Sequence, residues 1–251
     1  DDSIKSKTRF ALVYLHGFSA SHEEGNPIYQ DIATKYKMNI FLSRLSDHGR
    51  IKQEPLSEFT AQQAWNDAKE AYAIGKMIGE KVILLSTSTG GTLSLLLTAH
   101  FTDIHAQILL SPNIQIKDPT AFLLNNPWGL QLARKIIGSD YNKAKDTSIE
   151  YAKYWDPKYR LEALIQLEEL IESSMVPNNF KKINQPTLLL YYYKNDDQQD
   201  NVVSIDAMKK MYTSLSTPEN IKKEKALPHA GDHVLGSNLK SQDLESVRKE
   251  I

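Results

Sequence analysis

Short apolar runs alternate along the chain with longer stretches in which apolar residues recur every three or four positions. The runs are bounded by turn-forming residues, which is the pattern of buried β-strands. Strands are predicted at residues 10–15, 39–42, 81–85, 106–110, 187–193 and 221–226. Strands that are separated by helices usually lie parallel in one sheet. The pattern therefore predicts an α/β fold, with a mostly parallel central sheet flanked by helices on both faces.

The stretches between these runs have the period of amphipathic helices. Helices are predicted at residues 28–37, 59–74, 91–100 and 205–212, with a last one from about residue 241. The second of these helices is followed by Gly75. Glycine adopts the left-handed conformation that ends many helices, so Gly75 is predicted to be its C-cap.

The alternation stops after residue 110. The segment 113–184 contains no convincing strand, and prolines separate its helix-like pieces. One piece has an amphipathic apolar stripe, formed by Leu161, Leu164, Ile165, Ile171 and Met175. Structureless loops of this length are uncommon in compact domains. We therefore expect residues 113–184 to be a helical subdomain, inserted between two parts of one core, residues 1–112 and 185–251.

Composition narrows the class of protein. The 251 residues are 41% hydrophobic and 24% charged, as in an ordinary globular chain, and 30 basic residues stand against 31 acidic ones. This balance gives no basic surface for nucleic acid, which is not expected as a partner. The sequence has no cysteine, which excludes disulfides, thiolate metal sites and a cysteine nucleophile. No histidine pair or acidic pair has metal-site spacing, so no metal and no cofactor is predicted.

The start of the chain is polar and begins at Asp1, not at Met. We expect a longer parent chain from which a signal or anchor segment was removed. No apolar run approaches the ~18 residues that a membrane span requires.

The strongest chemical signal follows the predicted strand at 81–85. There the chain continues as Ser86-Thr87-Ser88-Thr89-Gly90-Gly91 into a helix. A sharp strand-to-helix turn with small residues on both sides lifts its middle serine above the sheet, where it can act as a nucleophile. The helix N-terminus behind it favours negative charge. A turn at which a helix packs closely on a strand would explain the same residues without catalysis.

A second signal follows the first predicted strand, where His16, Gly17 and Phe18 form a turn. Glycine lets a backbone approach a substrate closely. Backbone N–H groups in such a turn stabilise the oxyanion of acyl transfer. The predicted donors are the N–H groups of Phe18 and Thr89. The imidazole of His16 is expected only to brace the loop.

The orienting acid and the general base are expected in the loops after the last two predicted strands, because in this kind of turn-borne serine site the chain order is serine, acid, histidine. His233 follows Gly231 and Asp232 after the last strand and is the predicted base, with His229 as the alternative. Asp196, Asp197 and Asp200 follow the preceding strand. Asp200 is preferred because Val202 and Val203 can anchor its loop, and a carboxylate that orients an imidazole must be held still.

At these residues the sequence resembles the α/β-hydrolase superfamily, and within it small bacterial esterases and monoacylglycerol-lipase-like enzymes with a helical cap. The resemblance covers nearly the whole chain. It rests on Leu15-His16-Gly17-Phe18, Ser46-Asp47-His48-Gly49-Arg50, the Ser88 turn, Leu110-Ser111-Pro112, Asp200-Asn201-Val202-Val203 and Gly231-Asp232-His233. The sequence departs from the family at Ser86, where relatives carry glycine, and relatives have one or two strands before the first one predicted here.

The resemblance implies that residues 113–184 are the cap over the active site. It also implies export or membrane anchoring in preference to a cytoplasmic location. The expected activity is hydrolysis of a small-molecule ester with an apolar acyl group, through Ser88, His233 and Asp200. Apolar cap residues are predicted to line the substrate pocket, although packing of the cap on the core explains them equally well: Phe122, Leu123, Leu124, Trp128, Leu130 and Leu132.

Two alternatives stay open from the sequence. The first keeps the same three residues and changes the substrate to a thioester, a peptide or a carbon–carbon bond, because the pocket decides among these. The second is a non-catalytic binding protein with this fold, for which the departure at Ser86 is the support. The sequence does not decide the oligomeric state.

Overall fold

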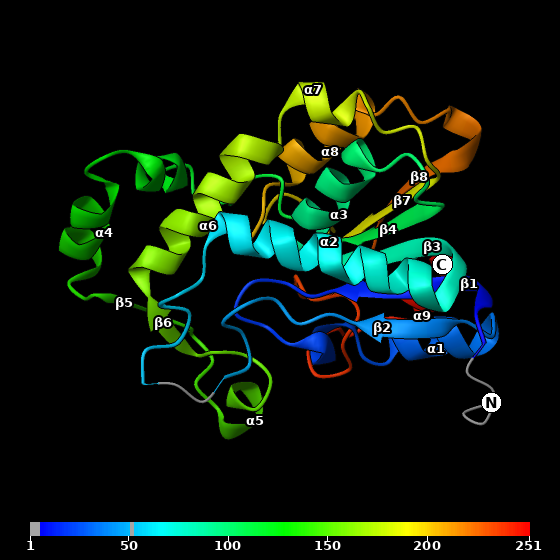
Figure 1. The fold of residues 1–251 in the computed structure, drawn as a ribbon. Coiled ribbons are helices and arrows are strands. Elements are labelled where there is room, and N and C mark those ends of the chain that lie inside the picture. Colours follow the sequence, from blue (N-terminus) through cyan, green and yellow to red (C-terminus); the bar gives the residue numbers. More distant parts are fainter. Residues whose placement is uncertain (1–5, 51–52) are drawn as a thin grey trace.

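The computed structural model describes residues 6–50 and 53–251, and its centre is a six-stranded sheet (Figure 1). The strands lie in the order β2-β1-β3-β4-β7-β8, and each neighbouring pair is parallel. Their bounds are β1 (Thr8–Leu15), β2 (Asn39–Leu42), β3 (Gly79–Thr87), β4 (Ala106–Leu110), β7 (Thr187–Tyr191) and β8 (Lys222–Ala226). The predicted parallel α/β sheet is confirmed. The first five residues of the polar start lie outside the described residues.

Helices cover both faces of this sheet (Figure 1). One face carries α1 (Ile28–Lys35) and α9 (Leu244–Glu250); the other carries α2 (Ala61–Ile78), α3 (Thr89–His100) and α8 (Ile205–Ser214). Side chains of β1 alternate between the two faces. Leu12 and Tyr14 pack in the apolar cluster of α1, whereas Val13 and Leu15 pack in that of α2 and α3. Burial on both sides explains why β1 is a continuous apolar run.

The chain between β4 and β7 carries several helices and one short strand pair, and it extends beyond the sheet (Figure 1). It forms η2 (Ala121–Asn125), α4 (Gly129–Ile137), β5 (Tyr141–Lys143), α5 (Ile149–Ala152), β6 (Lys158–Arg160), α6 (Leu161–Ser174) and α7 (Pro177–Phe180). The antiparallel pair β5–β6 was not predicted, because strands of three residues are too short to show a period. The end of the segment joins the core, since Phe180 and Ile183 pack in the apolar cluster of β7 and α8.

The predicted end of α2 is wrong. The helix continues through Gly75 to Ile78, and Gly79 is its C-cap. A Cβ atom at position 75 would lie 2.6 Å from Cγ2 of Val13 on β1. Gly75 therefore serves the close packing of α2 on the sheet and does not end the helix.

Two short 3₁₀ helices complete the described chain, η1 (His22–Gly25) after β1 and η3 (Glu219–Ile221) before β8. Within residues 6–50 and 53–251, no helix has both the length and the apolar character needed to cross a bilayer.

Candidate active site

Because the strands are parallel, the loops after β1, β3, β7 and β8 gather at one edge of the sheet. Phe18 lies after β1, Ser88 directly after β3, Asp200 after β7 and His233 after β8. The structure brings these predicted residues together around a cavity of about 340 Å³, which Phe18, Ser88, Thr89 and His233 line. Asp200 lies behind His233 and is only 1% exposed.

Ser88 occupies a strained turn between β3 and α3. Its φ of 53° and ψ of −118° are unusual for a residue with a side chain. The turn is held on both sides, because the Ser88 amide donates to the Leu110 carbonyl at 3.1 Å and the Ser88 carbonyl accepts from the Gly91 amide at 2.8 Å. This is the geometry that presents a serine above a sheet at the start of a helix.

The small residues of the turn have separate steric reasons. A Cβ atom at Gly90 would lie 2.0 Å from the Leu15 carbonyl oxygen, and one at Gly91 would lie 2.5 Å from Cβ of Pro112. Ser86, at the position where the resemblance leads us to expect glycine, is fully buried. Its hydroxyl donates to the Ile108 carbonyl at 3.3 Å, so the larger side chain is accommodated.

His233 and Asp200 form a buried pair. Nδ1 of His233 lies 2.6 Å from Oδ2 of Asp200. The other oxygen of Asp200 accepts from the amides of Val202 at 2.8 Å and Val203 at 3.1 Å. The carboxylate is therefore fixed by its own loop, as the sequence argument required. Nδ1 carries the proton in this arrangement, which leaves Nε2 of His233 as a proton acceptor.

The alternatives to these two residues lie elsewhere. Asp196 and Asp197 are exposed, and Asp196 accepts from the hydroxyl of Tyr193 at 2.9 Å. His229 is exposed as well.

Electrostatics of the pair favour charge separation. Burial would raise the pKa of Asp200. The positive charge of His233 opposes this shift, as do the hydrogen bonds from His233 and from the two valine amides, and together they hold the pKa below its usual value. Burial would lower the pKa of His233, but the carboxylates of Asp200, Glu24 and Asp232 raise it above its usual value. Both shifts mean that an imidazolium next to a carboxylate is favoured in this pair.

Nε2 of His233 is buried and has no hydrogen-bond partner among the residues described. It shares the cavity wall with Ser88. In unliganded sites the bond between a nucleophile and its base is often long and tightens only with substrate. The free Nε2 is therefore available to a proton that comes from inside the cavity.

The loop after β1 is held by two histidines. Nδ1 of His16 lies 2.8 Å from the Gly17 carbonyl, and Nε2 of His16 accepts from the Leu45 amide at 3.0 Å. Nε2 of His48 accepts from the Ser19 amide at 3.0 Å. Burial lowers the pKa of His16 to about 3 and that of His48 to about 4, so both rings are neutral and brace the loop.

Two backbone amides of the cavity wall, those of Phe18 and Thr89, donate to no acceptor in the described part of the chain. Thr89 is the first residue of α3, so its N–H has no partner within the helix. The ring of Phe18 packs edge-on against Phe59 and Tyr159, with centroids 5.2 Å away in each case, which fixes its position. The two predicted oxyanion donors thus lie free at the cavity that holds Ser88.

The predicted pocket residues do not line this cavity. Phe122 and Trp128 are half exposed, at 56% and 51%, and Leu130 is partly buried outside the lining of either of the two cavities described here. Leu123, Leu124 and Leu132 line a neighbouring cavity, also of about 340 Å³. These residues were chosen for their apolar character, which does not reveal that η2 and α4 place them outside the cavity that Ser88 lines.

Other residues of the inserted segment take their place. The cavity wall includes side chains from α5, α6 and the chain around β6, namely Tyr151, Trp155, Tyr159, Leu164 and Leu167. Glu24 and Asn113 also line the cavity and were not predicted. Asn113 follows the Leu110-Ser111-Pro112 segment directly, which could have indicated it. Glu24 gave no signal, because burial of a lone glutamate cannot be seen in a sequence.

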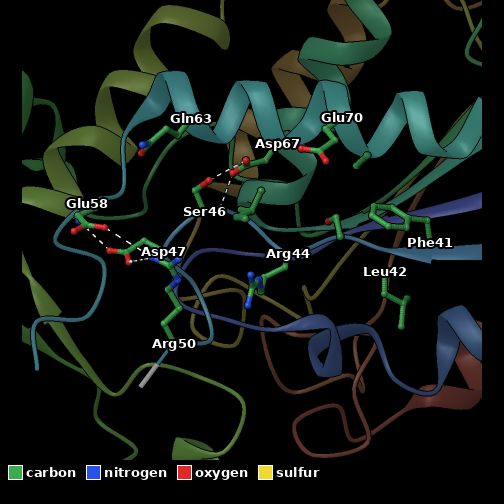
Figure 2. Close-up of a pocket in the computed structure, with 13 residues that line it drawn as sticks. Phe41, Leu42, Arg44, Ser46, Asp47, Arg50, Glu58, Gln63, Asp67 and Glu70 are labelled. Carbon is green, nitrogen blue, oxygen red and sulfur yellow. Dashed lines mark hydrogen bonds and ion pairs between the residues drawn. The ribbon is translucent and has the colours of Figure 1, made fainter. Parts of the chain in front are cut away.

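A larger cavity, of about 530 Å³, lies between the loop after β2 and helix α2 (Figure 2). Charged and polar side chains line it, and neither Ser88 nor His233 does. Asp67 accepts from the amide of Ser46 at 2.6 Å and from its hydroxyl at 2.9 Å, and Arg50 lies 3.7 Å from Asp47 (Figure 2). These contacts fix the loop whose Leu45 amide holds His16.

Comparison with known proteins identifies the fold. No protein-family model and no curated protein sequence matches this chain. Many solved structures do, however. One belongs to the metagenome-derived lipolytic enzymes LipS and LipT, with a TM-score of 0.78 and 15% identity over 98% of this chain and 92% of that chain.

Two further structures are similar over nearly the whole of this chain. The monoacylglycerol lipase of Paleococcus ferrophilus has a TM-score of 0.67 and 13% identity, over 99% of this chain and 97% of that one. The peroxisomal alpha-beta-hydrolase Lpx1 of Saccharomyces cerevisiae has a TM-score of 0.62 and 14% identity, over 98% of this chain and 76% of that one. The chain therefore has the α/β-hydrolase fold. At such identities the likeness establishes the fold and leaves the activity to be argued from the site.

Proposed function

We propose that this protein is a serine hydrolase that cleaves carboxylic esters, with Ser88 as nucleophile, His233 as general base and Asp200 as the acid that orients His233. The observation that carries the proposal is the buried His233–Asp200 pair, 2.6 Å apart, which leaves Nε2 free at the cavity that Ser88 lines. A binding protein has no need of this arrangement.

The reaction follows from the roles of these groups. Nε2 of His233 takes the hydroxyl proton of Ser88 as the oxygen attacks the ester carbonyl, and then gives it to the leaving alcohol. Asp200 stabilises the imidazolium that forms in between. Water hydrolyses the acyl-enzyme by the same route, so Ser88 is regenerated.

The oxyanion of each tetrahedral intermediate is bound by the N–H groups of Phe18 and Thr89. One such donor contributes about 3 kcal/mol to lowering the barrier. The N-terminus of α3 adds a partial positive charge at Thr89. Both donors are supported by the absence of another acceptor for them among residues 6–50 and 53–251.

The substrate that fits best is a small-molecule ester with an apolar acyl group. The cavity beside Ser88 and the neighbouring cavity share the side chains of Ile116 and Leu164 as a common wall. The neighbouring cavity is lined mostly by leucine, isoleucine and alanine from η2, α4 and α6. An acyl chain that passes Leu164 would bury its apolar surface there, at about 25 cal/mol for each Å² removed from water.

The inserted segment acts as a cap in this proposal. Its residues Tyr151, Trp155, Leu164 and Leu167 form part of the wall opposite the strand loops. The lipolytic enzymes among the similar structures support an ester substrate, and their identities of 13–15% leave its chemistry open to experiment.

The test is turnover of p-nitrophenyl esters of graded acyl length by the wild type and by Ser88→Ala. We expect the variant to lose esterase activity while its thermal unfolding stays close to that of the wild type. Ser173→Ala is the matched control, because Ser173 is an exposed serine bonded only to its own helix. Undiminished turnover by Ser88→Ala would refute the proposal, as would failure of a fluorophosphonate to label Ser88 in folded protein.

A further inference from the structure

A buried glutamate lies beside the proposed site and takes no part in the reaction described above. Glu24 belongs to η1, directly after the loop that follows β1. Its side chain is 3% exposed and lines the cavity together with Ser88 and His233. Buried carboxylates are rare unless they are paired or hydrogen bonded, because burial disfavours their charge. At this position we therefore expect the Glu24 carboxylate to have a hydrogen-bond donor or a positive charge beside it.

The first partner of Glu24 is the loop itself. The Gly17 amide donates to Oε2 of Glu24 at 2.5 Å, while the Gly17 carbonyl lies 2.8 Å from Nδ1 of His16. The peptide groups on both sides of Gly17 are thus held by side chains. The peptide on the carbonyl side is the one whose nitrogen belongs to Phe18. Fixing Gly17 consequently fixes the direction of the Phe18 N–H.

The carboxylate also lies close to the reacting groups. A Cβ atom at Gly17 would be 2.8 Å from Oε1 of Glu24 and 3.0 Å from Cβ of Ser88. Only glycine leaves room between them. On the other side Glu24 interacts electrostatically with His233, and the nearby indole of Trp155 favours the charged form of its carboxyl. Glu24 therefore lies between the oxyanion loop and the base.

We propose that Glu24 is a positioning residue for ester hydrolysis, which holds Gly17 so that the Phe18 N–H faces the oxyanion and which places a negative charge opposite the imidazole of His233. The inference rests on the function proposed above and adds a fourth side chain to it. In this proposal Glu24 transfers no proton and forms no bond to the substrate. It acts through Gly17 on the oxyanion loop and through the field at His233.

Several ionisable groups face this pair and set the background charge. They come from β1, α5 and the loops after β7 and β8: Tyr14, Tyr151, Asp200 and Asp232. Lys240 in turn interacts with Asp232 and lines the same cavity. Burial raises the pKa of Glu24 to about 7, although the Gly17 amide and His233 oppose this shift. Glu24 therefore changes charge in the same pH range as a histidine, and removal of its carboxylate must alter the titration of His233.

Two substitutions separate the hydrogen bond from the charge. Glu24→Gln keeps an oxygen that can accept from the Gly17 amide and removes the charge. Glu24→Asp keeps the charge and withdraws it by one methylene from Gly17. Both changes are small enough for the chain to fold, which thermal unfolding would verify. Glu23→Gln and Glu23→Asp are the matched controls, because Glu23 precedes Glu24 in η1 and its side chain accepts from Asn26 instead of from the loop after β1.

The experiment measures kcat and KM for a short p-nitrophenyl ester between about pH 5 and pH 9. Glu24→Asp should lose roughly 10- to 100-fold in kcat with little change in KM, since a displaced oxyanion donor acts on the transition state. Glu24→Gln should keep most of kcat on its plateau. The acid limb of its kcat/KM profile should move to lower pH, because a carboxylate opposite an imidazole favours the protonated ring.

The outcomes are distinguishable from those for the proposed function. A wild-type pH profile in Glu24→Gln together with wild-type kcat in Glu24→Asp would overturn the inference and leave the role of Ser88 intact. Equal losses in both variants, without movement of the acid limb, would also overturn it, because that result is expected from a glutamate that only stabilises the loop. Retained activity in Ser88→Ala would refute the proposed function itself.

Discussion

Gly90 lies so close beneath Leu15 that a methyl group on Gly90 would come within 2.0 Å of the Leu15 carbonyl oxygen. This contact joins the start of α3 to the end of β1. The Ser88 turn follows β3 and the proposed oxyanion loop follows β1, and β1 and β3 are adjacent in the sheet. The spacing between Ser88 and the Phe18 amide is therefore set by backbone packing against a residue without a side chain.

Gly90→Ala should destabilise the protein and reduce its activity together. The added methyl group must push α3 away from β1, which we expect to cost about 3 kcal/mol of unfolding free energy. Gly138→Ala is the control, because Gly138 has a φ of 67° and nothing within 4 Å of an added Cβ. That change should cost about 1 kcal/mol, from the left-handed backbone alone. Chemical denaturation of both variants would measure the difference, and equal losses would contradict the steric argument.

Asp200→Asn should reduce kcat by about 10⁴-fold while the fold is retained. The amide has the shape of the carboxylate, but it cannot stabilise an imidazolium and it allows the wrong tautomer of His233. Asp196→Asn, on the same loop but exposed, should behave as the wild type. Steady-state kinetics on a p-nitrophenyl ester would give both numbers. A loss confined to Asp196→Asn would mean that the acid had been assigned wrongly.

Leu164→Trp should shorten the accepted acyl chain. Leu164 lies in the wall of both neighbouring cavities, so a larger side chain would narrow the path proposed for the acyl chain past this residue. We expect kcat/KM for a long acyl ester to fall by at least about 10-fold, because each methylene excluded from the cavity stays exposed to water. The kcat/KM for an acetyl ester should stay the same. Glu169→Trp places the same ring on the exposed face of α6 and is the control. An equal loss for both esters would argue against the acyl passage.

Glu24 should make stability depend on pH. Its pKa is raised from 4.5 in an ordinary glutamate to about 7 in the fold. The folded state therefore favours the protonated form. The contribution of this proton to stability is complete below about pH 4.5 and is lost as the pH rises through about 7, with a difference of about 3 kcal/mol. Glu24→Gln should remove this dependence. The unfolding free energy of the variant minus that of the wild type, measured by denaturant titration, should therefore become more positive from pH 5 to pH 8. A constant gap would show that the Glu24 carboxyl titrates normally.

The parallel sheet was predictable because its inner strands, such as β1 and β4, are runs of apolar residues that pack on both faces, whereas the edge strand β8 is mostly lysine and glutamate. That pattern is a property of the local sequence and does not depend on how the rest of the chain folds. It placed strands at residues 10–15 and 81–85, where the structure has β1 at Thr8–Leu15 and β3 at Gly79–Thr87. The pair β5–β6 was missed, because three residues such as Tyr141–Lys143 carry no period.

Chain order made the meeting of the candidate residues at one edge of the sheet predictable in part. Ser88, Asp200 and His233 each follow a predicted strand, and parallel strands bring such loops to one edge. The lining of the cavity was not predictable in this way. Trp128 and Leu164 are both apolar residues of the inserted segment, but only the packing of η2, α4 and α6 decided that Leu164 faces Ser88 and that Trp128 is half exposed.

The amino-acid sequence by itself determined the strands, their parallel arrangement and the small residues at the turn around Ser88, because burial and steric size act on neighbours along the chain. The tertiary structure alone decided that Glu24 lies buried between Gly17 and His233 and that Gly75 lies inside a helix against Val13. Such contacts join residues that are distant in sequence or depend on the exclusion of water. No local pattern encodes them, since they exist only once the sheet and its helices have packed.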